Sequence, residues 1–263
     1  MPVTDAPAKA RALYDARRTR VPIPPFTDAD PTLGMADGYA IQRELIDLLL
    51  ADGDRIVGHK VGLTSKPMQQ MVGVDSPDYG PVLASTIYRD GDTIPVSRFI
   101  APKIEAEIVF VIGERLEGPG VTVTQAHAAI AGAVAAMEIV DSRIADWAIG
   151  FTDTVADNAS SGLFVVGSEG KTLDELEPVD VTMSLTIDGE ERSAGNGAAC
   201  LGDPLEALRW LAVQAYRFGD PLRAGHLILS GALGPFVPFA PGDRVETTIS
   251  GFAPLSVTFE EQL

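Results

Sequence analysis

The stretch KIEAEIVFVI at residues 103–112 constrains the fold of this chain more than any other. In a β-strand, successive side chains point to opposite faces, so the apolar residues of this stretch would form one face. Glu105 and Glu107 would then share the other face, with their Cα atoms roughly 6.5–7 Å apart at the usual rise of a strand. Two carboxylates this close repel each other unless a positive charge lies between them, and oxygen ligands suit magnesium or manganese. The pattern therefore predicts either a strand with a divalent metal site or an outer strand face in water.

A third carboxylate, Glu138, lies in the otherwise apolar segment MEIVD at residues 137–141. A lone Glu in such a strand-like segment is costly to bury unless it is paired or bound to a metal. Asp141 competes for this role, but strand alternation places it on the opposite face. Three carboxylates on one divalent cation would leave open coordination positions, which favours a site for a chelating substrate over a closed structural site.

Two further polar residues are candidates for chemistry. Lys60 lies between two glycines in the segment GHKVGLTS at 58–65, which reads as a strand. It is either a surface lysine whose stem is buried or a buried functional cation, and the flanking glycines would let a ligand or the backbone approach closely. Asp78 lies in SPDYG at 76–80, where the local sequence by itself favours a turn-forming aspartate.

The 26 glycines and 19 prolines imply many turns and more sheet than a helical bundle contains. Two amphipathic helices are predicted at the start of the chain, over residues 5–20 and 35–51. An Ala-rich helix is expected over 124–137, with Thr124 as its N-cap. Another should begin after the capping residue Asp203 and end near Gly219.

The rest of the chain alternates short strand-like segments with turns. A polar loop at residues 151–162 is of the kind that often carries function. The predicted strands and turns are a strand at 100–113, a hairpin at 179–193 turning at 188–189, and strands near 226–230, 244–250 and 254–259. The sequence therefore predicts an α+β fold, with a small helical N-terminal part followed by a β-rich domain.

Charge and composition exclude several functions. The net charge of −17 and the pI of about 4.4 disfavour nucleic-acid binding, because so acidic a surface repels phosphate groups. The apolar run at 128–137 is well short of a membrane span and is best explained as a buried helix. A single cysteine, Cys200, fits a reducing cytosol and leaves no internal disulfide. The basic stretch within residues 5–20 is best interpreted as a solvated helix face rather than a binding patch.

Taken together, the motifs resemble the 2-oxopent-4-enoate (2-hydroxypenta-2,4-dienoate) hydratases of bacterial aromatic meta-cleavage pathways. That family belongs to the fumarylacetoacetate hydrolase superfamily, together with the 4-oxalocrotonate decarboxylases. The resemblance covers nearly the whole chain, and its motifs are specific in combination although each is weak alone. They are GHKVGLTS at 58–65, DSPDYG at 75–80, IEAE at 104–107, EIVDSR at 138–143, DTVADN at 153–158 and LSGAL at 229–233.

The resemblance implies the chemistry of the site. A divalent metal, Mg²⁺ or Mn²⁺, would be held by Glu105, Glu107 and Glu138. Lys60 and Asp78 would lie near the reacting carbons, with Asp78 as the base for the attacking water and Lys60 orienting the substrate and moving protons.

The resemblance also implies an architecture. It predicts a helical segment over residues 1–54 and a fumarylacetoacetase-like catalytic domain with a mixed, β-barrel-like core over 55–263. Ser161 and the backbone near Leu83 would contact the substrate. The chain would assemble into a cytoplasmic homo-oligomer, a pentamer or a decamer, with neither a nucleic-acid nor a membrane partner.

The expected reaction is addition of water to 2-hydroxypenta-2,4-dienoate, giving 4-hydroxy-2-oxopentanoate. The segment at 143–154 resembles the hydratases, whereas GVDSP at 73–77 is shared with the decarboxylases, so 4-oxalocrotonate (2-oxo-3-hexenedioate) decarboxylation is the alternative. Hydrolysis of a C–C bond in an acylpyruvate usually needs a histidine, and His59 is the only one near the motifs. A non-enzymatic assembly subunit is also possible in this family, although the intact site residues argue against it.

Overall fold

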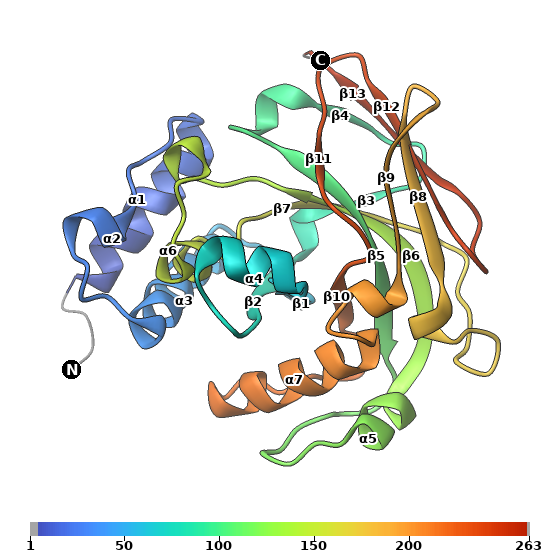
Figure 1. The fold of residues 1–263 in the computed structure, drawn as a ribbon. Coiled ribbons are helices and arrows are strands. Elements are labelled where there is room, and N and C mark those ends of the chain that lie inside the picture. The colour runs from blue at the N-terminus through green and yellow to red at the C-terminus, as the bar shows by residue number, and fades with distance from the viewer. Residues whose placement is uncertain (1–4, 262–263) are drawn as a thin grey trace.

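The computed structural model describes residues 5–261. Its N-terminal part is helical, with α1 (Ala6–Thr19), α2 (Phe26–Ala29) and α3 (Met35–Ala51) gathered at one end of the molecule (Figure 1). Ile41 and Leu45 of α3 are buried in one apolar cluster with residues of α1, as the spacing of the apolar residues predicts. The helices predicted at 5–20 and 35–51 are therefore confirmed.

The larger sheet contains eight strands and carries the candidate site. Its order is β2-β1-β10-β5-β6-β7-β3, and β11 also pairs with β5. Neighbouring strands are antiparallel, except that β1 runs parallel to β10 and β3 parallel to β7. The strands are β1 (Ile56–Gly62), β2 (Asp78–Leu83), β3 (Ile87–Arg89), β5 (Lys103–Ile112), β6 (Ile130–Val140), β7 (Ser161–Val166), β10 (Leu227–Ala232) and β11 (Val237–Pro238).

A second sheet of five strands has the order β4-β13-β12-β8-β9. Its strands are β4 (Thr93–Pro95), β8 (Thr182–Ile187), β9 (Glu190–Asn196), β12 (Arg244–Ile249) and β13 (Leu255–Glu260). Both sheets contribute to one apolar core, which includes Ile108 of β5 and Phe259 of β13. The predicted α+β class with a helical N-terminal segment is confirmed, and the strands are distributed over two mixed sheets.

The remaining helices are short, apart from α7. Asp203 caps α7 by accepting a hydrogen bond from the backbone N–H of Leu205, and the left-handed residue Gly219 follows the end of the helix, as predicted. The helices are α4 (Lys66–Val72), α5 (Val123–Ala128), α6 (Phe151–Ala156) and α7 (Pro204–Arg217), with 3-10 turns η1 (Ala84–Thr86), η2 (Val96–Arg98), η3 (Ala145–Trp147), η4 (Pro178–Asp180) and η5 (Gly197–Ala199).

The Ala-rich helix predicted over 124–137 is wrong. A short helix, α5, is capped by Thr122 rather than Thr124, and the chain then enters the long strand β6. β6 pairs along its length with β5 and, over its second half, with β7, so the sheet decides its conformation. Tertiary pairing overrides the helix propensity of alanine here, and the small side chains suit a strand buried inside a protein.

The predicted hairpin and the predicted C-terminal strands agree with the structure, whereas the loop predicted at 151–162 is wrong, because α6 and the start of β7 occupy most of it. The hairpin of β8 and β9 turns at Asp188 and Gly189, which both have the positive φ that this tight turn requires. The polar segment at 151–162 contains α6 and a tight turn before β7. In the described part of the chain, no helix combines the length and apolar character needed to cross a bilayer.

Candidate active site

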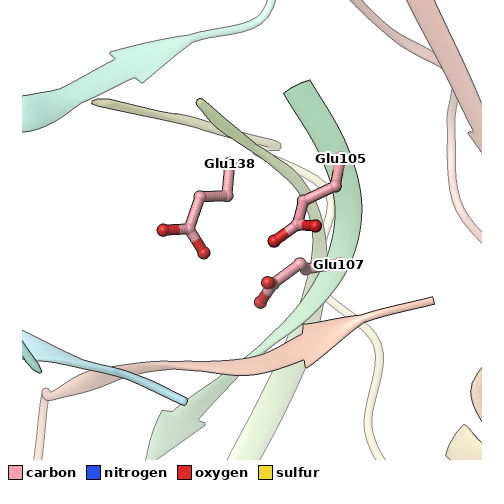
Figure 2. A group of neighbouring side chains, drawn as sticks. All are labelled: Glu105, Glu107 and Glu138. Carbon is pink, nitrogen blue, oxygen red and sulfur yellow. The ribbon is translucent and has the colours of Figure 1, made fainter. Parts of the chain in front are cut away.

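The strand pairing brings three carboxylates together. Glu105 on β5 lies directly opposite Glu138 on β6, and Glu107 is two residues further along the same face of β5. Figure 2 shows the three carboxyl groups turned toward one another, and one ligand oxygen of each lies within 4.8 Å of those of the others. The pair predicted from alternation on one strand is therefore completed by a residue of the neighbouring strand. Asp141 lies away from this group, where its carboxylate accepts hydrogen bonds from the backbone N–H groups of Ile100 and Ala101.

All three glutamates are buried, which raises the free energy of their charged forms. Glu107 and Glu138 have no exposed surface, and Glu105 is 9% exposed. Burial and the charge of Glu138 raise the pKa of Glu105 to about 8, and burial with the charges of both neighbours holds the pKa of Glu107 well above its usual range. Among the described residues, Glu107 Oε1 and Glu138 Oε2 have no hydrogen-bond partner. Convergent carboxylates with free oxygens fit a hard divalent cation, because such ions take oxygen ligands.

A bulge in β10 supports Glu107 from the other side. The pairing of β10 with β5 shifts register between Leu229 and Ala232, and the backbone N–H of Gly231 there donates to Glu107 Oε2 at 3.0 Å. Gly231 has a φ of +115°, and a Cβ at this position would lie 2.4 Å from the side chain of Thr64. Only glycine satisfies both conditions, which explains its place in the LSGAL segment.

Lys60 supplies a buried positive charge beside the carboxylates. It lies on β1 with 3% of its surface exposed, and its Nζ is 2.9 Å from Glu138 Oε1. Nζ also donates to the backbone oxygen of Ala159 at 2.9 Å. Burial alone would lower the pKa of Lys60, but the charges of Glu138, Asp78 and Glu105 outweigh it and hold the pKa above its usual value. The ammonium form therefore persists at neutral pH, and of the two interpretations the buried cation is correct.

Asp78 begins β2 and is buried, with 1% of its surface exposed. Its Oδ2 accepts a hydrogen bond from Thr154 Oγ1 at 3.2 Å, while its Oδ1 has no partner among the described residues. Burial raises the pKa of Asp78 to about 6, although Lys60 and the Thr154 hydroxyl oppose the shift. The local sequence favours a turn residue at this position, but the pairing of β2 with β1 brings the carboxylate beside Lys60 instead.

Gly62 leaves the space that Asp78 occupies. It pairs with Asp78 across β1 and β2, and a Cβ on it would lie 2.2 Å from Asp78 Oδ1 and 3.6 Å from Lys60 Nζ. Gly58 has a different role, because its missing side chain admits the backbone oxygen of Leu227 on the parallel strand β10. The two glycines that flank Lys60 thus allow close approach of a carboxylate and of a backbone, as their positions predict.

A strained turn positions the backbone oxygen of Ala159, which accepts the hydrogen bond from Lys60. Asn158, Ala159 and Ser160 are consecutive non-glycine residues with φ of 55°, 52° and 51°. This left-handed conformation costs each residue on the order of 1–2 kcal/mol, so the surroundings must impose it. Asp157, at the start of the turn, pairs with the buried Arg143, whose Nη1 also donates to the backbone oxygen of Ser161 at 2.8 Å.

Lys60, Asp78 and Glu105 line one cavity of about 230 Å³, whereas Glu107 and Glu138 are not among its lining residues. Its mouth carries Lys103, whose Nζ lies 4.1 Å from the centre of the Trp147 ring and 4.4 Å from that of Phe236, within the range of cation–π contacts. The residues that bear functional or shaping groups on its wall are Lys60, Gly62, Thr64, Asp78, Lys103, Glu105, Trp147, Thr154, Ser160 and Phe236. The site thus has a charged floor and a partly aromatic rim.

Two predicted substrate contacts are not among the residues that line this cavity. Ser161 is buried at the start of β7, next to the lining residue Ser160, and Leu83 is buried at the end of β2. Neither is among the lining residues, and their roles stay predictions. His59 lies on the opposite face of β1 from Lys60, where its Nε2 is 2.8 Å from Asp220 Oδ2.

Several wall residues were not predicted individually. Thr154 and Ser160 both lie in the polar segment at 151–162, and the only signal was the polarity of that segment. Their hydroxyls are 3.4 Å apart and continue from Asp78 as one hydrogen-bonded chain. Lys103, Trp147 and Phe236 come from three distant segments, so their convergence requires the fold.

Comparison with known proteins gives a consistent result. Residues 55–260 match the family model described as fumarylacetoacetate (FAA) hydrolase C-terminal. The chain is 47% identical over 251 residues to a 2-keto-4-pentenoate hydratase of Paraburkholderia xenovorans (strain LB400), covering 95% of this chain and 93% of that protein.

Solved structures share the fold. The 4-oxalocrotonate decarboxylase from Pseudomonas putida G7, complexed with magnesium and adipate, superposes with a TM-score of 0.94 at 34% identity, and the match covers 97% of each chain. The fumarylpyruvate hydrolase from Pseudomonas aeruginosa, in complex with Mn²⁺ and pyruvate, has a TM-score of 0.62 at 18% identity over 77% of this chain and 88% of that one, which is a likeness of fold alone.

The raised pKa values of the carboxylate group predict how metal and pH act together on stability. The protonated forms of Glu105 and Glu107 stabilise the metal-free fold fully below the pKa of an unfolded Glu, about 4.3, and the contribution of Glu105 declines as the pH rises through about 8. A divalent cation binds the ionised forms, so its stabilising effect should increase with pH. We expect saturating Mn²⁺ to raise the Tm more near pH ~8.5 than near pH ~6 in calorimetric melts.

The matched variants for this measurement are Glu107→Gln and Glu190→Gln, since Glu190 is an exposed residue of β9. The first should lose most of the effect of Mn²⁺, and the second should keep it. A wild-type Tm that does not respond to Mn²⁺ at high pH would contradict the metal site.

The space left by Gly62 gives a second prediction. Gly62→Ala should push the Asp78 carboxylate away from Lys60 and lower kcat by about 100-fold, as displacements near 1 Å do. Gly120→Ala is the control, because a Cβ there meets no atom within 4 Å. Steady-state kinetics of both variants checks this, and an unchanged kcat in Gly62→Ala would show that the position of Asp78 is unimportant.

Proposed function

Because the chain belongs to the 2-keto-4-pentenoate hydratase family of the fumarylacetoacetate hydrolase superfamily, we propose how its residues perform that family's hydration. The enzyme is a hydro-lyase of the 2-keto-4-pentenoate hydratase type. Its reaction adds water to 2-hydroxypenta-2,4-dienoate, the enol form of 2-keto-4-pentenoate, and gives 4-hydroxy-2-oxopentanoate. The observation that carries the proposal is that three buried carboxylates converge beside a buried ammonium, and that Lys60, Asp78 and Glu105 line one cavity of this chain.

In this proposal Glu105, Glu107 and Glu138 hold Mg²⁺ or Mn²⁺. Their unpartnered oxygens support it, and so does the magnesium in the complex of the structurally similar decarboxylase. When bound, such a cation would supply Lewis-acid chemistry, polarising the 2-oxygen of the substrate and stabilising enolate charge there. The glutamates themselves fix the place of that chemistry, because two strands and the Gly231 N–H hold them.

Lys60 binds and orients the anionic end of the substrate. Its ammonium lies between the Glu138 carboxylate and the Ala159 carbonyl, and two of its three N–H groups are directed at these oxygens. The third N–H remains for the substrate. Since its pKa lies above the usual value, Lys60 stays in the ammonium form and acts as a hydrogen-bond donor rather than a base. We assign to it the delivery of protons as the dienol is converted to the keto form with a proton added at C5.

Asp78 accepts the proton of the water that adds at C4. Thr154 occupies Oδ2, which leaves Oδ1 as the free basic oxygen facing Gly62 and Lys60. With a pKa of about 6, the carboxylate is mostly ionised at neutral pH and still close enough to the working pH to accept a proton effectively. Water bound at Oδ1 would lose one proton to Asp78 as its oxygen bonds to C4, and C3 then takes up a proton.

The remaining parts of the architecture belong to the same proposal. The cavity of about 230 Å³ has room for a five-carbon acid together with a water molecule. Residues 1–54 are proposed as the helical segment and 55–263 as the catalytic domain. A homo-oligomer, pentameric or decameric, in the cytoplasm is proposed on the sequence resemblance, as are substrate contacts by Ser161 and the backbone near Leu83.

Decarboxylation of 4-oxalocrotonate is the second candidate. The observation in its favour is the close superposition with the decarboxylase complexed with magnesium and adipate. Identity to that enzyme is 34%, against 47% to a hydratase, which is why hydration is preferred. Hydrolysis of an acylpyruvate is less suited to this site, because His59 is directed away from the cavity toward Asp220.

Turnover of the two substrates tests the function. Purified protein with Mg²⁺ or Mn²⁺ should convert 2-hydroxypenta-2,4-dienoate to 4-hydroxy-2-oxopentanoate. The loss of the dienol absorbance measures the rate, and NMR identifies the product. Carbon dioxide release from 4-oxalocrotonate should be much slower. A faster release of carbon dioxide than hydration would make this a decarboxylase.

The base role of Asp78 gives a separate prediction. Asp78→Asn keeps the size of the side chain and removes the base, so water addition should be lost while exchange of the C3 or C5 protons with deuterated buffer continues. NMR of the substrate and a parallel product assay measure both. In the wild type, kcat should fall as the pH drops below about 6, because protonated Asp78 cannot accept a proton.

The Thr154→Val variant is the matched control for this pH profile. It removes the hydroxyl that stabilises ionised Asp78, so the acid limb of the profile should move to higher pH while activity at high pH is retained. Undiminished hydration by Asp78→Asn would remove Asp78 from the mechanism.

A further inference from the structure

Four arginines surround a second, smaller cavity on the other side of the β6 terminus. This cavity has a volume of about 50 Å³ and lies where the end of α1 meets η2 and β7. Its wall includes Arg17, Arg20, Arg98 and Arg143, with Asp141 and Gly162. So many guanidinium groups around one small space are notable in a protein with a net charge of −17.

The two groups closest to the sheet are already engaged. Arg143 pairs with Asp157, and Asp141 accepts hydrogen bonds from the backbone N–H groups of Ile100 and Ala101. The carboxylate of Asp141 is therefore directed at the backbone. It neutralises only part of the charge around the cavity.

The other three arginines lack acidic partners. Within residues 5–261, no carboxylate lies within 4.0 Å of the guanidinium of Arg17, Arg20 or Arg98. Arg98 donates a hydrogen bond to the Tyr88 hydroxyl, and the Nε of Arg20 is buried without any partner among the described residues.

Other arginines of the same helix behave differently. Arg11 pairs with Asp15, and Arg18 lies 3.9 Å from Asp52, so these two form the solvated face predicted for the basic stretch. Arg17 and Arg20 point to the cavity instead. The solvated-face interpretation therefore holds for only part of the stretch.

This arrangement is unfavourable without a counterion. Burial and the neighbouring charge of Arg143 lower the pKa of Arg17 to about 10, Asp157 opposes this shift in part, and Arg20 and Arg98 add to it. A buried donor without a partner costs about 1–3 kcal/mol, and more when it is charged. An anion in the cavity would relieve both the repulsion and the missing hydrogen bond.

The size and shape of the site select the class of anion. A water needs about 10–15 Å³ of such volume, so 50 Å³ holds about three to five heavy atoms. Three guanidinium groups from different directions offer more donors than the two oxygens of a carboxylate accept, whereas a tetrahedral oxyanion presents four oxygens. We infer that Arg17, Arg20 and Arg98 form a binding site for a tetrahedral oxyanion, a phosphate or sulfate group, that ties the end of α1 to η2.

Isothermal titration of the full-length, magnesium-loaded protein with sodium sulfate tests this site, with sodium chloride at matched ionic strength as the reference. One saturable sulfate site per chain is expected. Arg17→Gln and Arg98→Gln should each weaken it at least 10-fold, whereas Arg192→Gln, which changes an exposed arginine of β9, should leave it unchanged. A parallel titration compares inorganic phosphate with glycerol 3-phosphate, which carries an esterified phosphate. Tighter binding of inorganic phosphate would show that the cavity takes the free ion and not an esterified phosphate.

Thermal melts distinguish a variant that has lost the sulfate site from one whose fold is destabilised. Without sulfate, Arg98→Gln should be at least as stable as the wild type, because it removes like-charge repulsion, and sulfate should raise the Tm of the wild type alone. Equal sulfate affinity in all variants, or no saturable binding, would overturn the proposal. The proposal would also be overturned if no sulfate binds and Arg98→Gln dissociates an oligomer. The arginines would then pair with carboxylates of a second copy of the chain.

Discussion

The repulsion among three buried carboxylates is the constraint around which this molecule is organised. Glu105 and Glu138 face each other across two paired strands, and Glu107 adjoins them, so the register of β5 and β6 fixes the backbone positions of all three. One ammonium and one backbone N–H offset part of the charge. The remaining repulsion is large because these groups are buried, and it would be relieved by the divalent cation that we propose for this site.

The rest of the site depends on close backbone approach. Gly62 makes room for the Asp78 carboxylate, and Gly231 turns its N–H toward Glu107 at a bulge. The strained turn at 158–160 directs the Ala159 carbonyl at Lys60, and the buried Arg143–Asp157 pair holds that turn. Thr154 then fixes one oxygen of Asp78 and leaves the other free. Lys60, Asp78 and Glu105 are thus held at one cavity by elements far apart in the sequence.

Much of this was predictable from the sequence, for identifiable reasons. Strand periodicity put Glu105 and Glu107 on one face, and the cost of burying Glu138 among apolar residues pointed to the same site. Resemblance to a known family was needed for Asp78, because its local sequence describes a turn and only the pairing of β2 with β1 brings it to Lys60. The Ala-rich segment at 128–137 was wrongly predicted to be helical, since propensity is local and pairing with β5 and β7 is not. Thr154, Trp147 and the arginines of the second cavity could not be assigned, because their partners come from distant segments.

The most direct test of this account is a crystal structure of the protein soaked with Mn²⁺, with anomalous diffraction recorded at the manganese edge. The account predicts one strong anomalous peak for a manganese ion that is coordinated by one oxygen each of Glu105, Glu107 and Glu138. Its metal–oxygen distances should be about 2.0–2.3 Å, and the ion should face Lys60 and Asp78 across the cavity. A peak on other ligands, or three glutamates that share protons with no metal between them, would contradict it.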